Sequence, residues 1–134
     1  VDVAETAVAI AREKAAARGV EAEFVVADAL QLDRLGRLFA TVLDCGLFHT
    51  FDGQERLRYA ASLASVTERD GTLYVLCFSD EGPDRGPHPI GRADLSAAFS
   101  SETGWTVAAI DSDRTQTRYH DDGAPAWLAT IKRT

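Results

Sequence analysis

Short apolar segments typical of buried strands alternate with helical segments along this chain of 134 residues. The strand patterns cover residues 22–27, 39–43 and 72–78. Apolar residues at helical spacing cover residues 5–18, 54–66 and 92–99, while residues 30–38 suit an irregular turn or a short helix. Parallel neighbours in a sheet need a crossover, which a helix normally supplies. The alternation therefore predicts an α/β fold with a mostly parallel sheet and helices on both faces.

The end of the chain has a different pattern. Residues 105–110 and 126–131 are predicted to form a terminal pair of antiparallel strands. Between the strand at 72–78 and the helix at 92–99 lies a segment rich in Gly and Pro, residues 79–91. A long loop at a strand end is either a functional loop or a solvated connector, and both interpretations stay open.

Size and charge restrict the possible partners. A chain of this length buries one core, so residues 1–134 are expected to form a single domain. The formal net charge of −7 provides no basic stripe for a nucleic-acid backbone or an anionic membrane. No apolar run has the length of a membrane span or a signal segment. Cys45 and Cys77 lie far apart in the sequence, which favours reduced thiols. We expect a cytoplasmic protein with a small-molecule partner.

Three aspartates stand where predicted strands end. Asp2 precedes the first helix, and Asp28 and Asp44 follow the strands at 22–27 and 39–43. In open parallel sheets, ligands bind beyond the carboxyl ends of the strands. Ionised carboxylates only accept hydrogen bonds, which suits ribose hydroxyls, an adenine amino group or an ammonium group. The alternative is that each aspartate only ends a strand or caps a helix, Asp2 above all.

The order and spacing of these segments resemble one family over nearly the whole chain. The segments are VDVAETAVAIAREKAAARG, FVVADAL, FATVLDCGLFH and RDGTLYVLCFSD. They are similar to successive parts of the class I S-adenosylmethionine-dependent methyltransferases, in their seven-strand Rossmann-like form. Two departures are minor: Asp70-Gly71-Thr72 stands in place of Pro-Gly-Gly, and Ala40 stands where Asp is common. The resemblance implies methyl transfer from S-adenosylmethionine to O, N or S of a small-molecule acceptor.

The resemblance also implies roles for particular residues. Asp2 would accept from the ribose hydroxyls and Val3 would pack on the adenine, while Asp28 would take the adenine amino group beside the backbone of Ala29. The methionine portion would be lined by Asp44, Cys45 and Gly46. Phe48 and His49 would lie near the sulfonium and the methyl acceptor. If the loop at 79–91 covers the acceptor pocket, rather than being a solvated connector, Phe78 and His88 are candidates to line it. His49 could remove a proton from the acceptor, or could only pack and hydrogen-bond in the pocket.

No metal site is expected, because His120-Asp121-Asp122 are neighbours on a turn and cannot enclose an ion by themselves. The family's first strand and glycine-rich loop have no counterpart in this sequence. We therefore expect an N-terminally truncated fold with a vacant slot between the strand that ends at Asp2 and the strand at 39–43. Such a chain would be poorly stable, or would fill the slot by forming a homo-oligomer or a strand-swapped dimer.

Two alternatives remain open. One is a non-catalytic Rossmann-like remnant that binds no cofactor. The other is a nicotinamide-dependent oxidoreductase, which is disfavoured because the missing loop would have to hold a pyrophosphate and no Tyr-x-x-x-Lys pair occurs.

Overall fold

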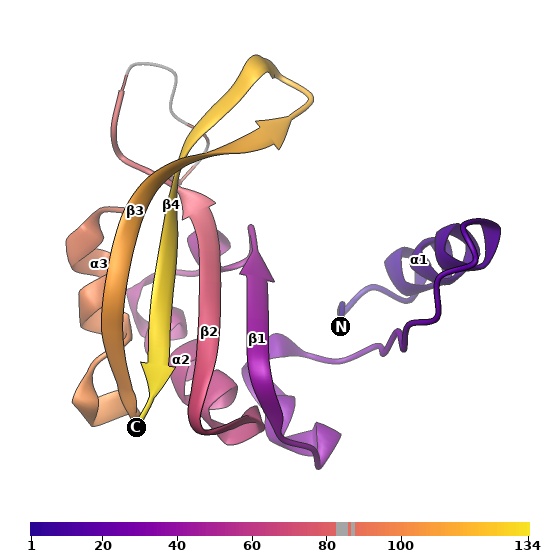
Figure 1. Ribbon diagram of the computed structural model, residues 1–134, viewed down its shortest axis with the longest axis horizontal. Helices are drawn as coiled ribbons and strands as arrows, with labels where there is room; N and C mark the ends of the chain where they lie inside the picture. The colour runs from indigo at the N-terminus through magenta and orange to yellow at the C-terminus, as the bar shows by residue number, and fades with distance from the viewer. Residues whose placement is uncertain (83–85, 87) are drawn as a thin grey trace.

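The computed structural model describes residues 1–82, 86 and 88–134. Its centre is a four-stranded sheet in the order β1-β2-β4-β3 (Figure 1). The strands are β1 (Phe39–Cys45), β2 (Thr67–Phe78), β3 (Trp105–Thr117) and β4 (His120–Arg133). β1 runs parallel to β2, and β4 runs antiparallel to both β2 and β3. The Rossmann-like α/β class and the antiparallel C-terminal strand are confirmed. Parallel pairing within this sheet is confined to β1 and β2.

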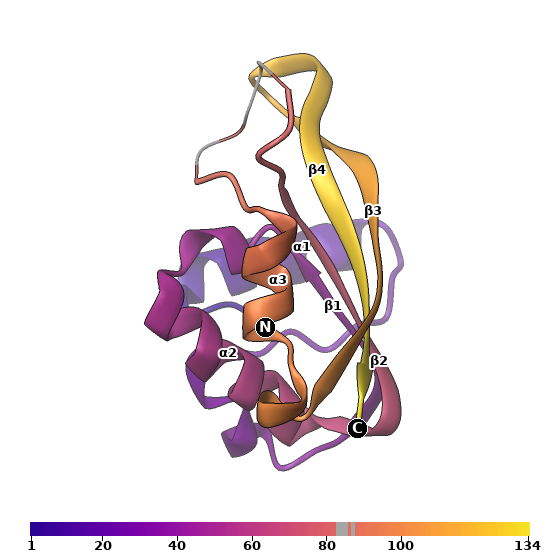
Figure 2. The same ribbon diagram turned by 90° about the vertical axis from the view of Figure 1, so that its left-hand side faces the viewer.

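Of the α-helices in the described residues, two lie on one face of the sheet and one lies beyond the sheet's edge (Figure 1 and Figure 2). The α-helices are α1 (Glu5–Ala17), α2 (Gly53–Val66) and α3 (Arg92–Ala98), and the 3-10 helices are η1 (Ala29–Leu35), η2 (Phe48–Thr50) and η3 (Ser101–Thr103). α2 and α3 cover the same face (Figure 2). α1 lies apart, on the far side of a gap beyond β1 (Figure 1). The three helices predicted from apolar spacing are confirmed, with ends that differ by one residue.

The core forms between the sheet and the pair α2 and α3. Alternate residues of β2 and β4 point into it because successive side chains of a strand face opposite sides. The two tryptophans, Trp105 and Trp127, are exposed by 0% and 1%. Each indole N–H donates to a backbone carbonyl, Trp105 to Ala60 at 3.0 Å and Trp127 to Ile90 at 2.7 Å. These bonds fasten the C-terminal hairpin to α2 and to the segment before α3.

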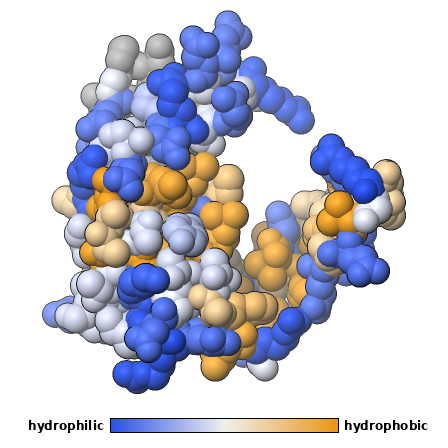
Figure 3. Space-filling view, viewed as in Figure 1, coloured by the Kyte–Doolittle hydropathy of each residue, from blue (hydrophilic) through white to orange (hydrophobic). Residues whose placement is uncertain are grey.

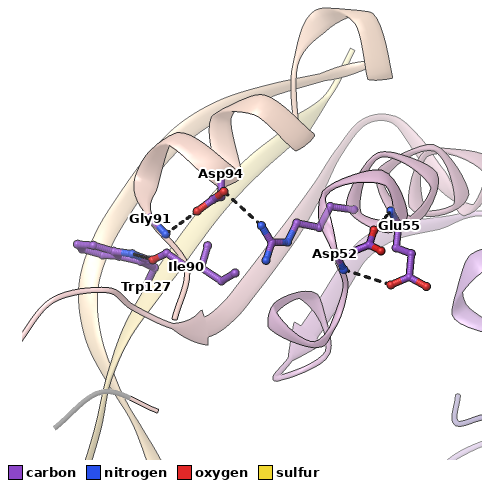
Figure 4. Close-up of polar contacts among 7 residues, drawn as sticks. Asp52, Glu55, Ile90, Gly91, Asp94 and Trp127 are labelled. Atoms are coloured by element: carbon purple, nitrogen blue, oxygen red, sulfur yellow. Dashed lines mark hydrogen bonds and ion pairs between the residues drawn. The ribbon is translucent and has the colours of Figure 1, made fainter. Parts of the chain in front are cut away.

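The start of α2 is determined by a capping box. The Asp52 side chain accepts from the backbone N–H of Glu55 at 2.8 Å, and the Glu55 side chain accepts from the N–H of Asp52 at 3.1 Å. Two N–H groups that the helix leaves unpaired are satisfied in this way. Figure 4 shows this pair. α2 therefore begins directly after η2, the short turn that follows β1.

The prediction of a strand at residues 22–27 is wrong. The structure has a single parallel bridge there, between Asp2 and Val26. The N–H of Asp2 donates to Val25 at 3.1 Å, and the N–H of Ala27 donates to Asp2 at 2.9 Å. A longer strand needs a partner along its length, and among the described residues only the short segment at Asp2 lies beside it. Val26 is 44% exposed as a result.

The predicted turn at Asp70-Gly71 lies inside β2 rather than before it. The pairing with β1 jumps there, from Phe39 opposite Thr67 to Thr41 opposite Thr72. Asp70 has a φ of 63°, and a Cβ on Gly71 would lie 2.8 Å from the carbonyl oxygen of Glu68. The two residues therefore form an irregularity in which glycine is required.

Candidate functional site

A cavity of about 580 Å³ opens between the N-terminal segment, η1 and the carboxyl end of β1. In Figure 3 it is visible as a deep notch with hydrophobic residues along its walls. All residues predicted to contact the cofactor line this cavity, namely Asp2, Val3, Asp28, Ala29, Asp44, Cys45 and Gly46. They come from three separate segments of the chain. The fold thus brings the three predicted strand ends to one cavity.

Asp2 and Asp28 also have local structural partners. The Asp2 carboxylate accepts from the N–H of Ala4 at 2.8 Å, just before α1. The Asp28 carboxylate accepts from the N–H of Leu30 at 2.9 Å and from the side-chain amide of Gln31 at 3.0 Å. Both side chains are exposed. A carboxylate has about four acceptor positions, so these bonds leave room for a ligand. Each of the two aspartates can therefore stabilise its local backbone and also accept a hydrogen bond from a ligand.

Asp44 differs from the other two aspartates because it is only 4% exposed. One carboxylate oxygen accepts from the N–H of Leu47 at 2.8 Å, and the other accepts from the N–H of Phe48 at 2.9 Å. The Tyr59 hydroxyl is a further hydrogen-bond partner. Burial raises the pKa of Asp44, and these hydrogen bonds oppose that rise. The side chain is thus held within the protein.

The residues predicted to line the acceptor pocket lie elsewhere. Within the part of the chain that the structure describes, none of Phe48, His49, Phe78 and His88 belongs to the wall of the cavity. Phe48 is 0% exposed, and its ring lies 5.4 Å from the ring of Phe99. η2 directs this side chain into the core, and a contact between Phe48 and an acceptor stays a prediction.

His49 and Phe78 form a ring pair at the carboxyl end of the sheet. Their ring centroids lie 4.5 Å apart, and both residues are half-buried. The Nδ1 atom of His49 is buried and has no hydrogen-bond partner among the described residues. Burial, with a smaller contribution from the charge of His88, lowers the pKa of His49. A neutral imidazole at this position can accept a proton.

The predicted loop at 79–91 is closed at its base. The N–H of Ile90 donates to Phe78 at 2.9 Å, and the N–H of Asp80 donates to Ile90 at 3.1 Å. Figure 4 shows two further hydrogen bonds that hold the end of the loop. The Trp127 indole N–H donates to the carbonyl of Ile90, and the N–H of Gly91 donates to the Asp94 carboxylate. His88, the loop's predicted pocket residue, is exposed. Residues 83–85 and 87 of this loop lie outside the described residues.

Several lining residues were not expected from the sequence. Tyr59 of α2 and Leu32 of η1 line the cavity, as do Phe51 and Leu63. In the sequence these residues follow the apolar spacing of ordinary core positions, so no local signal separates them from the rest of the core. Tyr59 alone carries a polar group, whose partner Asp44 is distant in sequence and could not be inferred.

Three further observations concern the described residues. They contain no group of three or more His, Cys, Asp and Glu side chains that could hold a metal ion. No helix among them combines the length and hydropathy needed to cross a membrane. Cys45 and Cys77 are free thiols, the first exposed and the second buried.

Comparison with known families gives a match over residues 1–71 to the family described as "Methyltransferase domain". The chain belongs to this family. Membership confirms the resemblance to the class I enzymes, whose cofactor is S-adenosylmethionine. The match covers more than half of the chain and includes every residue of the cavity wall.

Individual relatives agree with this assignment. The chain is 32% identical over 117 residues to the 2-heptyl-1-hydroxyquinolin-4(1H)-one methyltransferase of Mycobacteroides abscessus, covering 84% of this chain and 51% of the relative. It therefore spans about half of that relative's length. A structure solved for the conversion of a disulfide bond into a thioacetal group during echinomycin biosynthesis has a TM-score of 0.84 and 30% identity. That match covers 98% of this chain and 64% of the other.

A more distant structure shows the fold alone. The magnesium protoporphyrin IX methyltransferase of Synechocystis, solved with bound S-adenosylmethionine, has a TM-score of 0.68 and 21% identity to this chain. The match covers 98% of this chain and 57% of that one.

Proposed function

We propose that this protein transfers a methyl group from S-adenosylmethionine to a small-molecule acceptor. The observation that carries the proposal is the cavity at the carboxyl end of β1, whose wall contains every residue that the family resemblance assigns to the cofactor. These residues supply exposed carboxylates and apolar surface, which are the groups that a nucleoside requires.

The residues of the cavity suggest how the cofactor would be held. Asp2 and Asp28 keep free acceptor positions for the ribose hydroxyls and the adenine amino group. Val3 is 73% exposed, so its side chain is available to one face of the adenine, beside the backbone of Ala29. Cys45 and Gly46 would line the methionine portion. Asp44 would contribute through its main chain, because its residue is only 4% exposed and its carboxylate is held by the N–H groups of Leu47 and Phe48.

Bound S-adenosylmethionine supplies a methyl group on a positively charged sulfur. The protein's own task is to align the acceptor atom with that methyl group and to exclude water. His49 is the residue we propose for removing the acceptor's proton, since its imidazole is half-buried and its pKa is lowered, so it is neutral at pH 7. The alternative is that His49 only packs against Phe78 in the pocket.

A small acceptor is favoured by two observations. The net charge of −7 opposes binding to nucleic acids and anionic membranes. The relative from Mycobacteroides abscessus is named for a hydroxyquinolinone, a planar aromatic compound with an acidic hydroxyl. We propose an acceptor of similar size, methylated on O, N or S. A cytoplasmic location is part of the proposal, supported by the free thiols of Cys45 and Cys77.

The outer edge of β1 supports a proposal about assembly. Among the described residues, β1 pairs with β2 on one side only. Leu43 of β1 is 68% exposed and lines the same cavity as Val3, which is 73% exposed. A parallel strand placed there would cover this surface and join the two parts of the fold. We propose that the residues 1–134 alone fill the slot by self-association, and that an added upstream strand makes them monomeric.

Binding of S-adenosylhomocysteine tests the proposed function. Calorimetric titration of the intact protein should show binding, and Asp28→Asn should weaken it by about tenfold through loss of a charge-assisted hydrogen bond. Asp33→Asn, an exposed aspartate of η1 outside the cavity wall, is the matched control and should bind like the native protein. Absence of binding in the intact protein would favour the non-catalytic remnant.

A further inference from the structure

We infer that Asp44 and Tyr59 form a positioning pair that holds the turn of residues 46–49. This turn connects the wall of the cofactor cavity to the His49 side chain. This inference rests on the proposed function, because the turn is of interest as the link between methyl donor and acceptor. Both residues belong to the wall of the cavity, and we assign the pair a positioning role. The role of the pair is to fix the positions of the cavity wall and of the His49 imidazole relative to each other.

The carboxylate of Asp44 is the fixed point of the turn. It is 4% exposed, and its two oxygens accept separately from the consecutive N–H groups of Leu47 and Phe48, at 2.8 and 2.9 Å. A residue at the end of β1 thereby fixes the direction in which the chain leaves the sheet. Buried charge-assisted hydrogen bonds of this kind are strong and directional.

Tyr59 anchors the carboxylate to a rigid helix. Its hydroxyl is hydrogen-bonded to Asp44, its side chain is 4% exposed, and its ring lies 4.9 Å from the ring of Phe51. The helix that carries Tyr59 begins with the capping box at Asp52. The position of Asp44 is therefore set from α2 as well as from β1.

The turn itself connects the two halves of the site. On one side, Cys45, Gly46 and Leu47 line the cavity. On the other side, a Cβ added to Gly46 would lie 3.6 Å from the Cε1 atom of His49, so the imidazole packs directly over the turn. Gly46 has a φ of 91° and donates to Leu76 of β2 at 2.9 Å. Any rotation of this turn moves the cavity wall and His49 together.

Methyl transfer is sensitive to such a movement. The acceptor atom, the methyl carbon and the sulfur must lie in line, and a misplacement of about 1 Å can reduce the rate about a hundredfold. The nucleoside half of the cofactor is assigned to Asp2 and Asp28, which lie on other segments. Loss of the positioning pair should therefore reduce kcat and leave cofactor affinity nearly unchanged.

The test is Tyr59→Phe in the intact protein, which removes only the hydroxyl. We expect kcat to fall by about tenfold or more, while KM for S-adenosylmethionine and Kd for S-adenosylhomocysteine stay within about threefold. Tyr74→Phe is the matched control, because Tyr74 is 37% exposed and lies outside the cavity wall. It should leave all three constants unchanged.

A spectroscopic measurement tests the pair without activity. In an ¹⁵N–¹H correlation spectrum, Tyr59→Phe should shift the backbone amides of Leu47 and Phe48 more than those of η1. Unchanged amides, or an unchanged kcat in Tyr59→Phe, would overturn the inference. So would a parallel loss of S-adenosylhomocysteine affinity, which would mean that the pair serves cofactor binding. If the native protein neither binds nor transfers, the proposed function fails, and the amide shifts still decide whether the pair holds the turn.

Discussion

Replacement of Phe48 by Ala distinguishes a core residue from an acceptor contact. The side chain is 0% exposed, stacks 5.4 Å from Phe99, and lies under the guanidinium of Arg56 at 5.5 Å. Truncating a buried Phe to Ala removes the transfer free energy of the ring and leaves a cavity, at a cost of about 3–5 kcal/mol. Domains of this size are stable by only about 5–15 kcal/mol, so the loss is a large fraction of the total.

The assay is equilibrium unfolding in urea, followed by the fluorescence of the two buried tryptophans. Phe48→Leu should cost less, about 1–2 kcal/mol, because it keeps most of the apolar volume. Tyr119→Ala is the surface control, since Tyr119 is 90% exposed and lies outside the cavity wall, so the change should alter stability by less than about 0.5 kcal/mol. A loss below about 1 kcal/mol in Phe48→Ala, together with a raised KM for the acceptor, would show that the ring contacts the acceptor and would refute this reasoning.

Three other perturbations have definite expected outcomes. Burial and His88 lower the pKa of His49 in the folded state. The contribution of His49 to stability is therefore complete above about pH 6.5 and is lost as pH falls through the folded pKa. Urea unfolding at several pH values should show this loss, and His49→Gln should abolish it. If His49 is the base, the acid limb of the kcat/KM profile should lie below about pH 6.5. Gly71→Ala should destabilise by about 1–3 kcal/mol in the same assay, because its Cβ would lie 2.8 Å from the Glu68 carbonyl oxygen; an unchanged midpoint would contradict the close approach. Asp52→Ala should cost about 0.5–2 kcal/mol by thermal unfolding through loss of its cap, whereas Asp52→Ser should recover most of it.

Local pattern was sufficient for most elements of this protein. Apolar spacing predicted α1, α2 and α3, and short apolar segments predicted β1 and the paired β3 and β4, because each of these elements has a periodicity that its own residues display. The order of the segments was sufficient to identify the family and to name seven of the residues that line the cavity. Their individual contacts with cofactor remain predictions.

Side-chain partners depended on the tertiary structure. The sequence predicted a strand at 22–27 from its apolar residues, but strand formation also needs a neighbour. In the part of the chain that the structure describes, only Asp2 pairs with Val26. The sequence predicted Phe48 at the acceptor, and the direction of a side chain on a short turn depends on which element packs behind it, here Phe99 and Arg56. Asp44 was rightly placed at a strand end, while its burial against Tyr59 depended on α2 packing across the sheet. The sequence by itself thus determined the elements and the family. The tertiary structure decided which polar groups form hydrogen bonds inside the protein and which face the cavity. The physical reason is that their partners lie on segments distant in sequence, which only the packed fold brings together.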